Sequence, residues 1–210
     1  VTVEQLEAAR TDKTKVLVLN SPSNPTGMIY SREELLAIGN WAVAHDVLIL
    51  ADDIYGRLVY NGNEFVPISS LSEAIRKQTI VINGVSKAYA MTGWRVGYAV
   101  GNPEVIAAMS KLTGQTTSNL TAVSQYATIE ALTGPQDSVE TMRQAFEERL
   151  NTIYPLLCQV PGFEVVKPQG AFYLFPNVKK AMEMKGYTDV TEFATAILEE
   201  VGLALITGAG

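Results

Sequence analysis

The chain has 210 residues, of which 47% are hydrophobic, and a net charge of −6 at pH 7. A chain of this length can build one substantial core, or one core and part of another. The negative net charge and the absence of a long basic run argue against nucleic acid or an anionic membrane as the main partner. A local site for a small anionic ligand remains compatible with this charge distribution. The single cysteine, Cys158, excludes an internal disulfide framework and fits a reducing compartment. No apolar run has the length of a membrane span, so we expect no membrane partner and a cytoplasmic protein.

Apolar strand-like runs alternate with helical patterns over the first two thirds of the chain. Strands are expected at 15–20, 47–51, 79–83 and 97–100. A capping box at 31–34 predicts the start of a helix between the first two strands. Near-continuous Val, Ile and Leu strands separated by helices indicate an α/β fold, with a mostly parallel sheet covered by helices on both faces.

Helical patterns predominate after the fourth expected strand. Helices are expected at 103–112 and 119–132, and a long helix at 137–158. Beyond it we expect a hairpin or meander of strands 163–166 and 171–175, a helix over 188–200 and a terminal strand at 203–206. The interpretation is a partial large domain over 1–135, then a connecting long helix and part of a smaller α+β domain over 136–210. The chain ends just after a bare strand-like run, so we expect it to be a piece of a longer protein.

Polar residues follow the carboxyl ends of three expected strands. Asn24, Asp52 and Lys87 each come after a different one. Ligands of open α/β sheets bind at the carboxyl ends of the strands, so one pocket could collect all three side chains.

Lys87 is the first candidate for covalent chemistry. An amine attacks a carbonyl only in its neutral form, which a desolvated pocket or a nearby positive charge favours. Arg95, further along the same segment, could bind a phosphate through two parallel hydrogen bonds. A solvated surface lysine is the alternative.

Asp52, Asp53 and Tyr55 follow directly on a buried strand. A carboxylate there is costly unless a hydrogen bond or a cation compensates it, and a protonated pyridine nitrogen is one such cation. The alternative is a helix start capped by one of the two acids. A metal site is not expected, because no histidine or third acid lies nearby in the sequence. The loop around Asn24 has its own alternative, an ordinary connection between a strand and a helix.

Residues 84–97 (GVSKAYAMTGWRVG) resemble the lysine segment of the class I and II pyridoxal-phosphate aminotransferases. Segments 20–27, 51–55, 118–120 and 167–175 are similar to further segments of that family, in the family's order. The resemblance runs from about residue 20 to the end of the chain and implies the fold type I architecture. The amino-acid sequence of residues 90–95 (AMTGWR) is most similar to that of the bacterial aspartate aminotransferases.

The resemblance implies a role for each candidate residue. Lys87 would hold pyridoxal 5'-phosphate as an internal imine and move the substrate proton. Asp52 would pair with the pyridine nitrogen, while Asn24 and Tyr55 would hold the phenolic oxygen. Arg95 would bind the phosphate.

Several smaller expectations accompany the resemblance. Ser86 would help to bind the phosphate, and Asn24 would also contact the substrate. The Asn24–Pro25 peptide is expected to be cis. Gly84 departs from the family pattern, because some relatives carry a phosphate-binding serine there. Phe172 and Tyr173 are interpreted as core residues.

The expected reaction is transamination between an amino acid and a 2-oxo acid, with L-aspartate and 2-oxoglutarate first. Aromatic or alanine transamination, a pyridoxal-dependent lyase of the same fold and a ligand-sensing regulator are the alternatives. The resemblance further implies a homodimer. It also implies that three parts of the family's site lie outside these 210 residues: the glycine-rich phosphate turn, the aromatic ring that stacks on the cofactor and the arginine that binds the substrate carboxylate. We therefore expect these residues alone to be inactive.

Overall fold

A computed structural model describes residues 1–208 of the chain. The chain forms two compact units, which are described separately. The first comprises Val1–Glu148 and Pro168–Tyr173, and the second comprises Arg149–Lys167 and the residues from Leu174 onward. The long helix α6 (Asp137–Leu157) contributes residues to both units.

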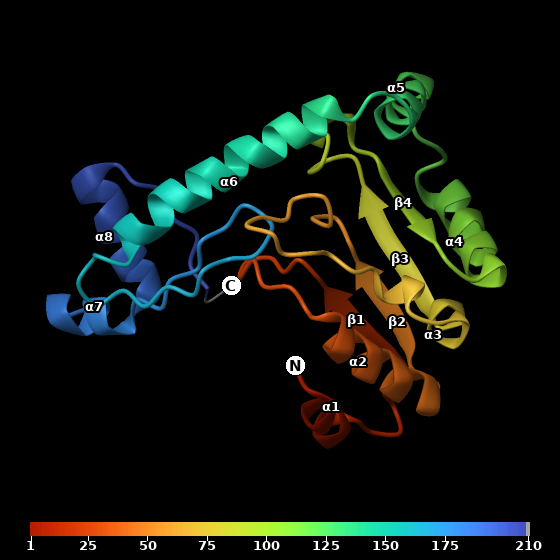
Figure 1. Cartoon of the computed structure of the whole chain (residues 1–210), viewed down its shortest axis with the longest axis horizontal. Helices are drawn as coiled ribbons and strands as arrows, with labels where there is room; N and C mark the ends of the chain where they lie inside the picture. Colours follow the sequence, from red (N-terminus) through yellow and green to blue (C-terminus); the bar gives the residue numbers. More distant parts are fainter. Residues whose placement is uncertain (209–210) are drawn as a thin grey trace. The chain divides into compact units, whose positions relative to one another are not determined.

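The first unit is built on a four-stranded sheet with the order β1-β2-β3-β4 (Figure 1). The strands are β1 (Val16–Asn20), β2 (Leu48–Asp52), β3 (Thr79–Gly84) and β4 (Gly97–Val100). The first three strands run parallel, and β4 pairs antiparallel with β3. In this register Asn20 lies opposite Asp52, so the carboxyl ends of β1 and β2 meet at one edge of the sheet.

Helices cover one face of the sheet around a shared core. Helix α2 (Arg32–Ala44) begins at the predicted capping box, where the Ser31 side chain accepts from the Glu34 backbone N–H. Its apolar side packs with α3 (Glu73–Lys77) and the buried sides of β1 and β2. The core residues of this cluster are Leu19, Leu35, Ile38, Trp41, Ala42, Val47, Ile49, Ala51, Ile68 and Ile75. The α/β fold with a mostly parallel sheet is therefore confirmed.

The opposite sides of the same strands are more open. Burial alternates along β2, where Ile49 and Ala51 are buried and their neighbours are half-buried. On β1 the side chain of Val18 is 65% exposed. The helices α4 (Pro103–Thr116) and α5 (Ala122–Thr133) follow β4 in the chain, and α4 buries none of its residues.

The remaining helices are short or belong to the second unit. Helix α1 (Val3–Ala9) begins the chain, and two 3₁₀ turns occupy Ile68–Ser70 and Thr92–Trp94. The second unit contains the end of α6, α7 (Lys179–Lys185) and α8 (Val190–Val201). Phe193 of α8 is buried and contacts the Tyr187 ring.

The hairpin predicted for 163–166 and 171–175 is wrong. Glu164 pairs with Asn177 in a single antiparallel bridge, and the residues around it extend no ladder. Gly170, just before the second predicted strand, pairs with Val59 within the first unit. The predicted strand 171–175 itself is divided, because residues up to Tyr173 belong to the first unit and Leu174 begins the second. The terminal strand predicted at 203–206 is also wrong. Ile206 is 98% exposed, and no strand within residues 1–208 pairs with this run.

Candidate active site

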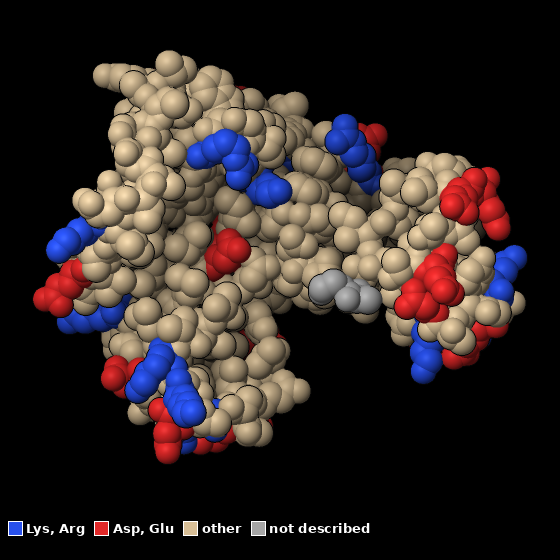
Figure 2. All heavy atoms as spheres, turned by 180° about the vertical axis from the view of Figure 1, so that it is seen from behind, with Lys and Arg blue, Asp and Glu red and all other residues tan. Residues whose placement is uncertain are grey.

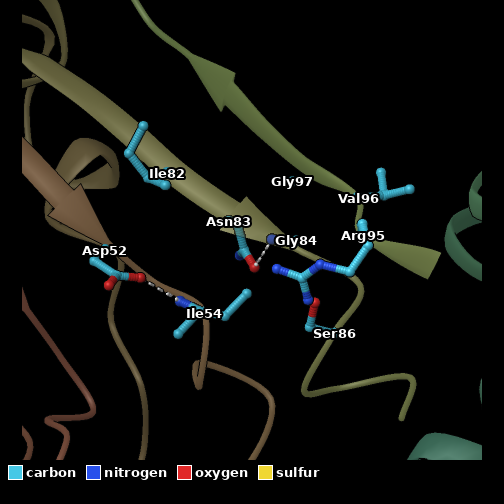
Figure 3. Close-up of a pocket in the computed structure, with 9 residues that line it drawn as sticks. All are labelled: Asp52, Ile54, Ile82, Asn83, Gly84, Ser86, Arg95, Val96 and Gly97. Carbon is cyan, nitrogen blue, oxygen red and sulfur yellow. Dashed lines mark hydrogen bonds between the residues drawn. The ribbon is translucent and has the colours of Figure 1, made fainter. Parts of the chain in front are cut away.

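A cavity of about 330 Å³ opens at the carboxyl ends of β2 and β3 (Figure 3). Asp52 ends β2 and Gly84 ends β3, while Gly97 begins the antiparallel strand β4. These termini and the loops that follow them supply the lining, which consists of Asp52, Ile54, Ile82, Asn83, Gly84, Ser86, Arg95, Val96 and Gly97. Three predicted site residues, Asp52, Ser86 and Arg95, therefore lie around one cavity.

Arg95 brings a positive charge to this cavity. Its backbone is left-handed, with φ of +56°, and its Nη1 donates to the Thr92 carbonyl at 2.8 Å. Figure 3 shows the guanidinium extending past the end of β3, toward Asn83 and Ser86. Within residues 1–208 no carboxylate forms an ion pair with Arg95. An arginine without an acidic partner beside a cavity is suited to bind an anion.

Asp52 brings a carboxylate to another side of the same cavity. Its Oδ1 accepts from the Ile54 backbone N–H at 3.2 Å, the interaction marked in Figure 3. Among the described residues no other donor reaches the carboxylate. A free carboxylate oxygen directed at a cavity can accept a hydrogen bond from a cationic N–H group of a ligand.

Asp53 is buried, and its side chain does not line the cavity. Its backbone N–H donates to the Ile82 carbonyl at 2.9 Å, and its carbonyl accepts from the Gly56 N–H. Burial, and secondly the charge of Asp52, raise the pKa of the Asp53 carboxyl to about 7. The two neighbouring acids thus differ in setting, with Asp52 at the cavity and Asp53 anchoring the loop to β3.

Lys87 lies beside two aromatic rings, outside the lining of the cavity. Its Nζ is 5.6 Å from the centroid of the Tyr55 ring and 5.4 Å from that of Phe172. These distances are within the range of attraction between a cation and an aromatic ring. The amine makes no hydrogen bond or ion pair with any residue in 1–208. Among the described residues, the two rings are thus the groups that hold the Lys87 amine.

Tyr55 is buried against Lys87, and its hydroxyl forms a short hydrogen bond with the Tyr173 hydroxyl. Burial above all raises the pKa of Tyr55 above its ordinary value. The proton therefore stays on Tyr55 at neutral pH, and the hydroxyl is a neutral donor.

Asn24 is exposed and is connected to the site through Asn20. The Asn24 backbone N–H donates to Asn20 Oδ1 at 2.7 Å, and Asn20 Nδ2 donates to the Asp52 carbonyl at 3.3 Å. The Asn24–Pro25 peptide is cis, as expected, and the Ser21–Pro22 peptide is cis as well. No described residue bonds to the Asn24 side chain, which is left available to a ligand.

Gly84 has a structural explanation for its departure from the family pattern. A Cβ atom at this position would lie 2.8 Å from the Val96 carbonyl oxygen and 3.2 Å from the Gly97 Cα. The close approach of β3 and β4 thus leaves no room for a serine side chain here.

The sequence-based prediction missed Asn20, Asn83, Phe172 and Tyr173. Asn20 and Asn83 end two predicted strands, and that position was the signal that could have found them. Phe172 and Tyr173 were interpreted as core residues, but Phe172 is 40% exposed and contacts Lys87. Tyr173 lies 118 positions from Tyr55, so no spacing in the sequence relates the two.

Outside this cavity, the surface charge visible in Figure 2, metal-binding groups and long apolar helices identify no second site among residues 1–208. On the face seen in Figure 2, acidic and basic side chains lie next to one another in several small groups. Within residues 1–208 no group of three or more His, Cys, Asp or Glu side chains could hold a metal ion. No helix in this part of the chain is long and apolar enough to span a membrane.

Comparison with known proteins gives consistent similarities over the whole chain. The sequence profile of the family "Aminotransferase class I and II" matches residues 1–210. An asparagine–oxo-acid transaminase from Streptococcus mutans is 79% identical over 209 residues, which are 100% of this chain and 53% of that protein. An aspartate aminotransferase from Bacillus sp. is 58% identical over 210 residues, again covering 100% of this chain and 54% of the relative.

Solved structures share the fold. The crystal structure of an aspartate aminotransferase from Rhizobium meliloti superposes with a TM-score of 0.93 at 37% identity, covering 100% of this chain and 54% of that one. The chain thus spans about half the length of the curated relatives and the structure that it matches.

Proposed function

Because this chain belongs to the class I and II aminotransferase family, we propose that the whole protein is a pyridoxal-phosphate-dependent transaminase. The observation that carries the proposal is the grouping of Arg95, Asp52 and Ser86 around one cavity at the carboxyl ends of parallel strands, with Lys87 directly following Ser86.

The residues present fit the chemistry of the cofactor. Pyridoxal phosphate carries an anionic phosphate, a basic ring nitrogen, a phenolic oxygen and an aldehyde. Arg95 and Ser86 supply donors for the phosphate, and Asp52 offers a carboxylate oxygen without a protein donor for the ring nitrogen. Tyr55 remains a neutral donor for the phenolic oxygen, and Asn24 is the second candidate for that oxygen. Lys87 supplies an amine without an ion-pair partner in the described chain.

Each of these residues has a distinct task in the proposed reaction. The bound cofactor supplies an aldehyde that condenses with amines and a ring that accepts electrons. Asp52 keeps the ring nitrogen protonated, which favours that electron acceptance. Arg95 and Ser86 fix the phosphate and thereby hold the reacting atoms near Lys87.

Lys87 has two tasks in this proposal. Its amine would hold the cofactor when the cofactor is bound, and the same nitrogen would take the proton from the alpha carbon of the substrate. The rings of Tyr55 and Phe172 beside Nζ limit the positions that the amine can take. Proton transfer by a positioned base contributes about 10²–10⁴-fold to rate.

The amino donor is proposed from the relatives, because the substrate's carboxylate site is not evident among the described residues. The relative at 79% identity bears the name of an asparagine–oxo-acid transaminase, so L-asparagine is the first donor to test. L-aspartate with 2-oxoglutarate, the expectation from the sequence, is the second, supported by aspartate aminotransferases at 52–58% identity. We further propose a cytoplasmic homodimer, as the family resemblance implies.

The test uses the full-length protein and its Lys87→Ala variant. We expect the wild type to develop a visible absorbance band with pyridoxal phosphate, and to convert asparagine or aspartate with 2-oxoglutarate into glutamate and the matching oxo acid. Lys87→Ala should lose the band and at least 10²–10⁴-fold of the rate.

A matched control is Lys13→Ala, which removes an exposed lysine of the first unit and should leave both properties intact. Products of elimination or decarboxylation without glutamate would assign a lyase instead. Full turnover by Lys87→Ala would contradict the proposed role of Lys87.

A further inference from the structure

The segment Pro168–Tyr173 lies in the first unit although its chain neighbours on both sides belong to the second. Its backbone is tied to the loop after β1, because the N–H groups of Gln169 and Gly170 both donate to the Gly27 carbonyl, at 2.8 and 2.9 Å. The fit is close, since a Cβ on Gly170 would lie 2.8 Å from the Pro22 Cβ and 2.9 Å from the Leu58 carbonyl oxygen.

The same segment is tied to the loop after β2. The Ala171 N–H donates to the Leu58 carbonyl at 2.9 Å, and the Tyr60 N–H donates to the Gln169 carbonyl at 3.0 Å. The Tyr60 hydroxyl donates to the carbonyl of Ala171, which is fully buried. Two loops that carry candidate site residues, Asn24 and Tyr55, therefore hold this segment in place.

These anchors fix the direction of the next two side chains. Ala171 has a left-handed backbone with φ of +59°. The Phe172 ring then contacts the Tyr55 ring edge-on, with centroids 5.3 Å apart and planes at 85°. The Tyr173 ring lies 5.6 Å from the Tyr55 ring, and the two hydroxyls share a short hydrogen bond.

We propose that Tyr173 is a positioning residue of the site, whose hydroxyl donates to the Tyr55 oxygen and directs the Tyr55 proton toward the phenolic oxygen of the bound cofactor. This inference rests on the proposed function. A hydroxyl that accepts a hydrogen bond becomes a stronger donor, because bonds in a chain polarise one another. Tyr173 thus acts on the cofactor only through Tyr55.

The groups that face Tyr55 come from three places in the fold. Lys87 follows β3, Asp52 ends β2 and Tyr173 belongs to the Pro168–Tyr173 segment. Burial above all, and also the charge of Asp52, keep the proton on Tyr55 and raise its pKa, so Tyr55 retains a proton to donate. Of these neighbours, Tyr173 is the one whose hydroxyl bonds to the Tyr55 hydroxyl.

The test measures a spectroscopic pKa in the full-length protein loaded with pyridoxal phosphate and without substrate. A donor at the phenolic oxygen draws electron density from the Lys87 nitrogen joined to the cofactor, so a weaker donor lets that nitrogen hold its proton to higher pH. Tyr173→Phe should therefore raise the pH midpoint of the visible absorbance change by roughly 0.5–1 pH unit. Tyr55→Phe should raise it further, and the double variant should match Tyr55→Phe alone.

Two controls separate this role from a structural one. Tyr60→Phe removes the buried hydroxyl that anchors Ala171 but keeps the Tyr173 hydroxyl, so it should lower the thermal midpoint and shift the spectroscopic midpoint by less than Tyr173→Phe does. Replacing Tyr173 by 3-fluorotyrosine keeps the shape and gives a more acidic donor, so the midpoint should fall below that of the wild type. This second variant also serves if Tyr173→Phe does not fold.

The outcomes distinguish this inference from the proposed function. A wild type that never forms the visible band would overturn the proposed function. The role of Tyr173 alone would be overturned if the wild type forms the band and Tyr55→Phe shifts its pH midpoint, but neither change at Tyr173 shifts that midpoint. Equal additional shifts in the wild type and in the Tyr55→Phe background would also overturn it, because Tyr173 would then act by another route.

Discussion

The Nζ of Lys87 lies 5.4 Å from the centroid of the Phe172 ring, although the two residues belong to distant parts of the chain. Phe172 also stacks on Phe146 of α6, with centroids 5.3 Å apart. A ring that is 40% exposed thus lies beside the Lys87 amine.

Phe172→Ala should reduce kcat/KM by about 10–100-fold, because the Lys87 amine would lose one of the two rings that limit its position. Thermal stability should change little, since Phe172 is 40% exposed. Steady-state kinetics and a thermal melt of the full-length protein would measure both. Phe175→Ala is the matched control, because Phe175 is 44% exposed in the second unit and should leave kcat/KM unchanged. Equal losses in the two variants would contradict the prediction.

Arg95→Lys should weaken binding of pyridoxal phosphate by about tenfold, because a lysine cannot offer two parallel hydrogen bonds to a phosphate. Binding of pyridoxal, which lacks the phosphate, should not change. Equilibrium dialysis with both compounds measures the ratio of the affinity for pyridoxal phosphate to the affinity for pyridoxal. The exposed Arg32 of α2 provides the control, as Arg32→Lys should leave both affinities intact. The same loss for pyridoxal and for its phosphate would argue against phosphate binding by Arg95.

Gly84→Ala should destabilise the protein by about 1–3 kcal/mol, because the added methyl group would press on the Val96 carbonyl where β3 and β4 approach. Gly93→Ala is a direct comparison, since a Cβ on Gly93 has no neighbour within 4 Å. That variant should differ from the wild type by less than about 0.5 kcal/mol. Urea denaturation of both variants measures the difference. A Gly84→Ala protein as stable as Gly93→Ala would disprove the steric explanation for the glycine.

Asp53 should make the protein less stable as pH rises from about 4 to 7. Burial and the charge of Asp52 raise the pKa of this carboxyl from 3.8 to about 7, so over this window the folded protein keeps a proton that the unfolded chain has lost. Asp53→Asn removes that difference. Above pH 7 the variant should be more stable than the wild type by about 2–4 kcal/mol, and near pH 4 the gap should close.

Denaturation across a pH series would test this, with Asp12→Asn as the control at an exposed acid of the same unit. Parallel pH curves for the wild type and Asp53→Asn would show that Asp53 ionises normally in the folded state.

Local patterns in the sequence were sufficient for most of the first unit. The apolar runs at 47–51 and 79–83 became β2 and β3, and the Ser31 capping box began α2. These elements are decided by neighbouring residues, because strand period, helix period and caps act over a few positions. The strand ends then placed Asp52 at the cavity edge, together with Ser86 and Arg95 from the segment after β3.

The segments beyond α6 could not be read in the same way. Residues 163–166 and 171–175 are apolar and alternate, which is typical of a hairpin. A ladder needs a partner along its whole length, however, and Gly170 pairs with Val59, a residue of the same unit from a distant part of the chain. The choice of partner depends on contacts between residues distant in the chain, which a local pattern does not contain.

The sequence by itself determined the α/β class, the lysine and its expected chemistry, because reactive groups and strand ends are visible as residue types in order. Only the tertiary structure decided which groups surround that lysine. Phe172 lies beside that lysine, and Tyr173 bonds to its neighbour Tyr55, because Gly170 and Ala171 are held against loops more than a hundred residues earlier in the chain. Such contacts arise from packing and backbone hydrogen bonds formed during folding, and no spacing along the chain encodes them.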